Sequence, residues 1–179
     1  SEFAKEQGLE IVKNKYFFTE SRYQSLKRLQ KRERERTEKD NTGTVGCAVL
    51  DTYGNICAGT STGGMTNKKY GRIGDSPIIG AGTYANNETV AVSATGHGEW
   101  FIRFSVAHDI HAMVDYKRWT VERAADFIIQ RKLNYFDVNG GLIVLDKNGE
   151  IAMPFNTPGM YRASIDRNGT LEVKIYGDE

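Results

Sequence analysis

The feature that most constrains the fold is an abrupt change in sequence character at Thr44. Immediately before it, the segment 27–40 reads KRLQKRERERTEKD, in which eleven of fourteen residues are charged. Such a segment has almost nothing to bury and cannot be core. From Thr44 the chain reads TVGCAVLD, whose alternate residues are apolar or small on both faces. This pattern predicts a boundary at Thr44, followed by a strand that is covered on both faces within a layered structure.

The residues before the charged segment have the pattern of short helices. Apolar side chains recur at helical spacing at Leu9, Val12 and Tyr16. The sequence FTES at 18–21 is suited to cap a second helix that begins near Arg22. We interpret residues 1–26 as helical and packed, and residues 27–40 as either a solvated helix extension or a mobile linker.

After Thr44 the pattern predicts strands, then two adjacent helices, then more strands. We expect strands at 44–51, 56–64, 89–94, 140–146, 150–155, 159–166 and 170–176, and helices at 99–114 and 120–133. Thr120 is the expected N-cap of the second of these helices. Asn-Gly pairs at 148–149 and 168–169 are strong hairpin signals. Antiparallel hairpins combined with paired helices favour an α+β class with stacked sheets flanked by helical layers.

Composition excludes several classes of function. The 179 residues carry 24 Lys and Arg against 23 Asp and Glu, a formal charge of +1, so no net field attracts nucleic acid or an anionic membrane. No stretch reaches the ~18 apolar residues of a membrane span, and the opening residues lack a signal-peptide pattern. We therefore expect no nucleic-acid partner, no membrane partner and a cytoplasmic location.

Threonines beside glycines are the first sign of chemistry. They occur as Gly43-Thr44, Thr62-Gly63-Gly64 and Thr95-Gly96-His97-Gly98, close to the ends of predicted strands. Hydroxyls beside flexible backbone indicate a hydroxyl-based site. The alternative is that Thr is simply common in strands and Gly in turns, which explains any single pair.

Five ordered motifs extend this pattern over most of the chain. They read GTVG at 43–46, TSTGGMTNK at 60–68, GRIGDSP at 71–77, GAG at 80–82 and TGHGE at 95–99. Together they resemble the plant-type asparaginase and isoaspartyl peptidase family of N-terminal nucleophile hydrolases. The resemblance implies the four-layer αββα sandwich of these hydrolases.

The resemblance also implies that only part of that fold is here. Residues 1–43 correspond to the C-terminal part of an α subunit with its charged mobile linker, and residues 44–179 to a β subunit that starts at the nucleophile. Family precursors are nearly twice this long, so the N-terminal half is expected to be missing. An open sheet edge and an open hydrophobic face should result. The expected partners are the remainder of the α subunit and a second αβ unit, as a homodimer.

Thr44 is the predicted nucleophile. A threonine hydroxyl needs a base beside it, and an N-terminal threonine supplies its own α-amine, whose pKa of ~7.7 to 8.0 leaves a sizeable neutral fraction near pH 7. Thr44 must first be released from Gly43, which the resemblance implies is autoproteolytic. Because glycine lacks a Cβ, Gly43 tolerates the strained geometry of that attack.

The resemblance assigns the remaining site residues. Thr62 hydrogen-bonds the nucleophile, and Thr95 with the Gly96 amide forms the oxyanion hole. Arg72 grips the α-carboxylate of an aspartyl substrate. Asp75 pairs with the α-ammonium of that substrate, and the Gly98 carbonyl assists it. Taken alone, Arg72 and Asp75 would be read as a surface salt bridge.

The predicted function is hydrolysis of the side-chain amide of asparagine and of isoaspartyl dipeptides, without cofactor or metal. His108 and His111 lie one helical turn apart, but a metal site needs further ligands. Cys47 and Cys57 are expected to be reduced core residues. One alternative is a catalytically inactive or incomplete family member that acts as a structural or binding subunit. Another is a relative of the glycosylasparaginases, which place Asp where this chain has Gly43.

Overall fold

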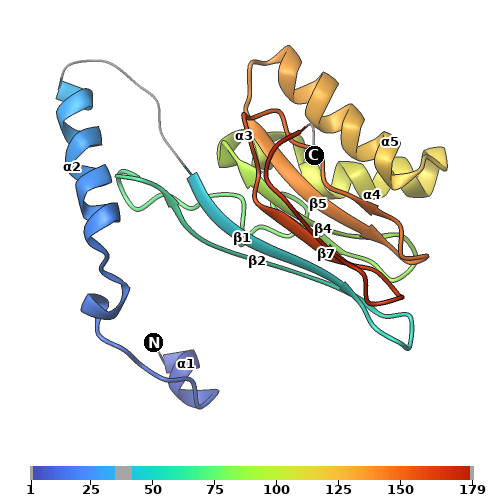
Figure 1. The fold of residues 1–179 in the computed structure, drawn as a ribbon, viewed down its shortest axis with the longest axis horizontal. Coiled ribbons are helices and arrows are strands. Elements are labelled where there is room, and N and C mark those ends of the chain that lie inside the picture. The colour runs from blue at the N-terminus through green and yellow to red at the C-terminus, as the bar shows by residue number, and fades with distance from the viewer. Residues whose placement is uncertain (1, 35–41, 178–179) are drawn as a thin grey trace. The chain divides into compact units, whose positions relative to one another are not determined.

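The computed structural model describes residues 2–34 and 42–177, which belong to two compact units (Figure 1). The first unit comprises 1–41 with 65–69, and the second comprises 42–64 with 70–179. The candidate site residues all belong to the second unit.

The first unit contains three short helical elements. They are α1 (Glu2–Glu6), the 3-10 helix η1 (Asn14–Phe17) and α2 (Glu20–Arg34). The hydroxyl of Thr19 accepts a hydrogen bond from the amide of Arg22 at 3.4 Å, so the predicted cap is confirmed. Residues 27–34 continue α2, which agrees with a helix extension. Residues 35–41, the rest of the predicted linker, lie outside the described residues.

The prediction that residues 1–26 are helical throughout and packed is wrong. Gly8 adopts a left-handed φ of 66° just after α1, and residues 9–13 are not helical. Leu9 and Tyr16 are 59% and 74% exposed, and neither α1 nor η1 has a buried residue. Three apolar residues at helical spacing are too few to nucleate a helix without a surface to pack against.

The second unit begins with a hairpin of β1 (Thr42–Leu50) and β2 (Ile56–Met65). Asp51 shapes the turn because its Oδ1 accepts the amides of Tyr53 and Asn55 at 2.8 and 2.7 Å. These bonds lower the pKa of the Asp51 carboxyl, the side-chain and backbone bonds from Asn55 most of all. The two strands confirm the predicted hairpin.

A four-stranded antiparallel sheet forms the centre of the unit. Its order is β3 (Thr83–Ala85), β4 (Val90–Gly96), β5 (Gly140–Asp146) and β6 (Ile151–Ala152). The β4–β5 register runs from Val90 opposite Asp146 to Gly96 opposite Gly140. A second hairpin joins β7 (Arg162–Ile165) to β8 (Leu171–Lys174). The last three predicted strands are present but shorter than predicted.

Helices cover one face of this sheet. They are α3 (Gly98–Phe104), α4 (Val106–Lys117), α5 (Val121–Asp126) and the π-helical turn η2 (Phe127–Leu133). The single helix predicted over 99–114 is broken at Ser105, which has a φ of 48°. The Thr120 cap is confirmed, since its hydroxyl accepts the amide of Arg123 at 3.3 Å. The mixture of helix and antiparallel sheet confirms the α+β class.

Side chains alternate between the two faces of β4, so one face meets the helices and the other meets the hairpin β1–β2. Val90, Val92 and Ala94 belong to the hydrophobic core shared with the helices. Ser93 points to the other face, where an ideal Cβ on Gly46 of β1 would lie only 2.1 Å from its Oγ. The hairpin β1–β2 therefore packs across β4 and β5 on the side opposite the helices (Figure 1).

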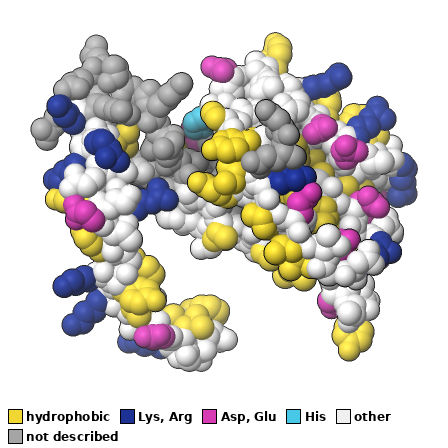
Figure 2. All heavy atoms as spheres, in the orientation of Figure 1, with side chains coloured by type: hydrophobic (Ala, Val, Ile, Leu, Met, Phe, Trp, Pro, Cys, Tyr) yellow, Lys and Arg dark blue, Asp and Glu magenta, His cyan; other side chains and the backbone are white. Residues whose placement is uncertain are grey.

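The outer face of β1 is open. Val45 and Val49 are 70% and 48% exposed, and Cys47 and Cys57 are free and exposed. Within the described residues, the outer face of this strand has no cover and the two cysteines are not in the core, contrary to the predictions, because only the Gly46 face meets another layer. The expectation of an open hydrophobic face is confirmed. Figure 2 shows further exposed hydrophobic side chains on this unit.

Phe101 of α3 is fully buried where β4 meets β5. An ideal Cβ on Gly96 would lie 2.7 Å from its ring, and one on Gly140 would lie 2.6 Å from it. Glycine is thus required on both strands so that the ring can lie beneath the end of β4. Phe101 thereby fixes the backbone of Thr95 and Gly96.

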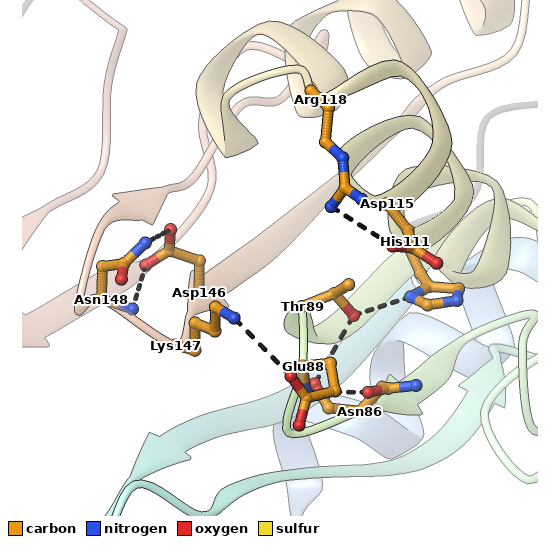
Figure 3. Close-up of polar contacts among 9 residues, drawn as sticks. All are labelled: Asn86, Glu88, Thr89, His111, Asp115, Arg118, Asp146, Lys147 and Asn148. Carbon is orange, nitrogen blue, oxygen red and sulfur yellow. Dashed lines mark hydrogen bonds and ion pairs between the residues drawn. The ribbon is translucent and has the colours of Figure 1, made fainter.

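His111 lies at the opposite end of β4, near its start (Figure 3). It is 6% exposed, and its Nδ1 lies 2.7 Å from the hydroxyl of Thr89. The rings of Tyr84 and His108 contact it, and the carboxylate of Asp115 is also near. Burial, reinforced by the charge of His108, lowers the pKa of His111, while Asp115 opposes this shift weakly.

We expect Gly140→Ala to reduce the free energy of unfolding by about 1–3 kcal/mol, because the new Cβ collides with Phe101 and with the carbonyl of Thr95. The matched control is Gly59→Ala, whose Cβ would meet nothing within 4 Å. That control should change stability by no more than about 0.5 kcal/mol. Urea unfolding of both variants is the measurement, and equal stability of the two would contradict the packing role of Phe101.

We also expect stability to fall as the pH drops below the unfolded-state histidine pKa of about 6.5. His111 has a lowered pKa in the folded state, so the unfolded chain binds its proton first, and protonation favours unfolding. Urea unfolding between pH 8 and 5 measures the loss. In His111→Gln the decline should be shallower, whereas His97→Gln should retain it. A decline of the same steepness in His111→Gln would refute the assignment.

Candidate functional site

The hydroxyl of Thr62 is the centre of the candidate site. It contacts the hydroxyl of Thr44, the carbonyl of Gly43 and the amide of Gly64. Thr44 is half-buried on β1, and its Oγ1 donates to the Oγ1 of Thr62 at 3.3 Å. Thr62 Oγ1 in turn donates to the carbonyl oxygen of Gly43 at 2.9 Å and accepts the amide of Gly64 at 2.9 Å. The hydroxyl of Thr62 is thus in contact with both the predicted nucleophile and the carbonyl of the peptide bond that precedes it.

The alignment of β2 with β4 places Thr95 at the same end of these two strands as Thr62. Asn55, just before β2, hydrogen-bonds Asn87, just before β4, and further along Thr60 hydrogen-bonds Ser93 at 2.6 Å. The two strands therefore run in the same direction. Thr62 and Thr95 each lie two residues beyond the second contact, on the same faces as Thr60 and Ser93.

The backbone after Thr95 is unusual. Gly96 has a φ of 152°, and its position opposite Gly140 above Phe101 leaves no room for a side chain. The amide of His97 donates to the carbonyl of Asn139 at 3.4 Å. Gly96 is therefore held in a conformation that favours glycine, at the turn between β4 and α3.

Asp75 is buried in the loop between β2 and β3, with 7% of its surface exposed. An ideal Cβ on Gly82 would lie 2.6 Å from one carboxylate oxygen, and one on Gly98 would lie 2.6 Å from the other. Asp75 also anchors its loop through its backbone, because its carbonyl accepts the amides of Ile78 and Gly82 at 2.9 and 3.2 Å. Its carboxylate lies in a slot that two glycines keep open.

Arg72 forms an ion pair with Glu99 at 3.7 Å, with both side chains substantially exposed. An exposed pair at this distance contributes little stability, so a ligand carboxylate can replace Glu99 at small cost. Because Glu99 follows Gly98 directly, the start of α3 contacts both Arg72 and Asp75. The two predicted substrate residues thus lie beside the loop of Thr95 and Gly96.

Sequence reasoning missed three supporting residues. Glu99 gave no signal of its own, since an acidic residue in a first helical turn is common. Gly82 is the last residue of the motif GAG at 80–82, but its contact with Asp75 arises only when the loop folds back on itself. Ser93 did leave a signal: it is a serine inside the apolar stretch VAVSA, and Gly46 inside a strand indicates a close approach.

Within residues 2–34 and 42–177, no group of three or more His, Cys, Asp or Glu side chains is placed to hold a metal ion. In the same ranges, no helix combines the length and the apolarity that crossing a bilayer requires.

Comparison with known proteins agrees with the motifs. The family model described as Asparaginase matches residues 1–175. The chain is 48% identical to an isoaspartyl peptidase of Escherichia coli, over 99% of this chain and 58% of that protein. It is 41% identical to a putative isoaspartyl peptidase/L-asparaginase of Dictyostelium discoideum, over 98% of this chain and 62% of that protein. It is 36% identical to the human isoaspartyl peptidase/L-asparaginase, over 100% of this chain and 58% of that protein.

The chain thus spans about three fifths of the length of these curated relatives. Both the family model and the relatives cover the first unit as well as the second. The match extends over nearly the whole chain, at identities well above those of chance similarity. The chain belongs to the asparaginase family.

Proposed function

We propose that this chain carries the nucleophile, the oxyanion donors and the substrate clamp of an enzyme that hydrolyses L-asparagine and isoaspartyl dipeptides. The observation that carries the proposal is the hydrogen bond from Thr62 Oγ1 to the carbonyl oxygen of Gly43, beside the hydroxyl of Thr44. The names of the curated relatives support the substrate class.

The first step is release of Thr44 from Gly43. The Oγ1 of Thr44 attacks the carbonyl carbon of Gly43, and Thr62 donates to the oxygen on which negative charge develops. The carbon–nitrogen bond breaks, the hydroxyl proton ends on the freed amine of Thr44, and Gly43 is left as an ester on Thr44. Water then hydrolyses this ester to a Gly43 carboxylate and a free N-terminal Thr44.

Catalysis uses the same hydroxyl. The free α-amine of Thr44 takes the proton from Oγ1, which attacks the side-chain carbonyl of the substrate. Thr95 and the Gly96 amide stabilise the oxyanion, and ammonia or an amino acid leaves with the proton. Water hydrolyses the resulting aspartyl ester and releases aspartate. Arg72 and Asp75 bind the α-carboxylate and α-ammonium of the substrate, with the Gly98 carbonyl as a further acceptor.

The same proposal assigns the parts of the chain. Residues 1–43 belong to an α subunit and residues 44–179 to a β subunit of a four-layer αββα sandwich. The helices, the central sheet and the hairpin β1–β2 supply three of those layers, and further α-subunit structure covers the outer face of β1. The exposure of Val45 and Val49 supports this cover. The assembled αβ unit pairs as a homodimer. The cytoplasmic location expected from the sequence stays a prediction.

We expect the purified chain to cleave itself between Gly43 and Thr44 on incubation, which intact mass measurement detects. Thr62→Val should slow cleavage by about 10² to 10³, because one donor to the developing oxyanion is lost. Thr62→Ser, which keeps the hydroxyl, is the matched control and should cleave at nearly the normal rate. Thr44→Ala should not cleave. A wild-type chain that stays intact would contradict a competent nucleophile.

We expect Asp75→Asn to raise the KM for β-aspartyl-leucine by about thirtyfold or more, because a buried charge that pairs with the substrate ammonium is worth about 2 kcal/mol or more. Release of aspartate from this dipeptide and from asparagine is the measurement. Glu88→Gln, in the exposed turn between β3 and β4, is the control and should change neither constant. A cleaved chain that acts on neither substrate would favour a structural or binding subunit instead.

A further inference from the structure

A group of three hydroxyls connects the two halves of the candidate site. Thr60 of β2, Thr83 of β3 and Ser93 of β4 form this hydroxyl cluster. Thr60 Oγ1 lies 2.6 Å from Ser93 Oγ, and Thr83 Oγ1 donates to Thr60 Oγ1. Ser93 is 3% exposed, while Thr60 and Thr83 are half-buried. The proposed mechanism gives none of these hydroxyls a role.

Two backbone carbonyls accept hydrogen bonds from the cluster. Thr60 Oγ1 lies 3.2 Å from the carbonyl oxygen of Gly82, and Thr83 Oγ1 lies 3.2 Å from that of Ser76. A carbonyl can only accept, and each hydroxyl has one hydrogen to donate. When Thr60 donates to Gly82, Ser93 and Thr83 both donate to Thr60, and the single hydrogen of Thr83 is shared between Thr60 Oγ1 and the Ser76 carbonyl. Thr60 is therefore the centre of the cluster.

Both carbonyls belong to the loop that carries Asp75. The amide of Gly82 donates to the carbonyl of Asp75, and the missing side chain of Gly82 leaves the space that the Asp75 carboxylate fills. The carbonyl of Gly82 accepts Thr60 as well as the amide of Ala94. Moving the Gly82 carbonyl would therefore move the slot that holds Asp75.

The other end of the connection is the nucleophile. Thr60 and Thr62 lie two residues apart on β2, so their side chains share a face. Thr62 contacts Thr44 and the Gly43 carbonyl. On β1, Gly46 leaves the space that Ser93 occupies, so the cluster lies directly where the two layers meet. The hydroxyls thus connect the strand of Thr62 to the loop of Asp75.

We infer that Thr60, Thr83 and Ser93 are positioning residues that set the separation between the Thr44–Thr62 pair and the Asp75 carboxylate, and so determine how well the substrate ammonium fits beside the nucleophile. The inference rests on the proposed function. It predicts an effect on substrate binding rather than on the chemical step, because the contact between Thr62 and Thr44 does not pass through the cluster.

The test compares Thr60→Val, which keeps the shape but removes the hydroxyl, with Thr60→Ser, which restores it. The matched control is Ser61→Ala on the exposed, opposite face of β2. KM and kcat for β-aspartyl-leucine are measured for each. Thr60→Val should raise KM about tenfold or more, because all three hydrogen bonds of Thr60 Oγ1 are lost, with kcat changed less than about twofold. Thr60→Ser and Ser61→Ala should behave as wild type.

A second readout does not depend on activity. Amide hydrogen exchange of Ile78 and Gly82, which both donate to the Asp75 carbonyl, reports the order of the loop. In Thr60→Val these amides should exchange about tenfold faster relative to Leu145 of the central sheet. Unchanged exchange, or a fall in kcat with KM unchanged, would overturn the inference. A wild-type chain without hydrolysis would instead refute the proposed function, and the exchange comparison would still decide whether the cluster holds the loop.

Discussion

The packing of the hairpin β1–β2 across β4 and β5 is the constraint on which the rest of the site depends. It places Gly46 against Ser93 and Thr60 beside both Ser93 and Thr83. Because β2 and β4 run in the same direction, Thr62 of one sheet and Thr95 of the other lie at the same end of the packed strands. Neither sheet alone holds the proposed nucleophile, the proposed oxyanion loop and the proposed substrate loop. Close approach at Gly46 is what permits this arrangement.

Glycines repeat this role at other points of the site. Gly82 and Gly98 leave the space for the carboxylate of Asp75, and Gly96 and Gly140 leave the space for the ring of Phe101. In each case the missing side chain lets a buried group lie against backbone, so a single Cβ would disturb the site. The concentration of glycine in the five motifs therefore has a packing cause as well as the conformational cause at Gly96.

Much of the fold could be predicted from local signals. Thr19 and Thr120 cap helices, and the Asn-Gly turns join strands, because these depend on neighbouring residues alone. The break at Ser105 and the exposure of Val45 were not predictable, since they depend on what each segment packs against. For the site, the motifs predicted roles for Thr44, Thr62, Arg72 and Asp75, and these roles stay proposals. The roles of Glu99 and the hydroxyl cluster depend on contacts between distant segments and needed the structure.

Thr44 is proposed to become an N-terminal nucleophile that forms an ester with aspartyl substrates. The most direct measurement is mass spectrometry of the chain, quenched in acid during turnover of β-aspartyl-leucine and digested to peptides. One aspartyl group is expected on the peptide that begins with Thr44. A cleaved chain that turns over this substrate with the aspartyl group on another residue would contradict the account.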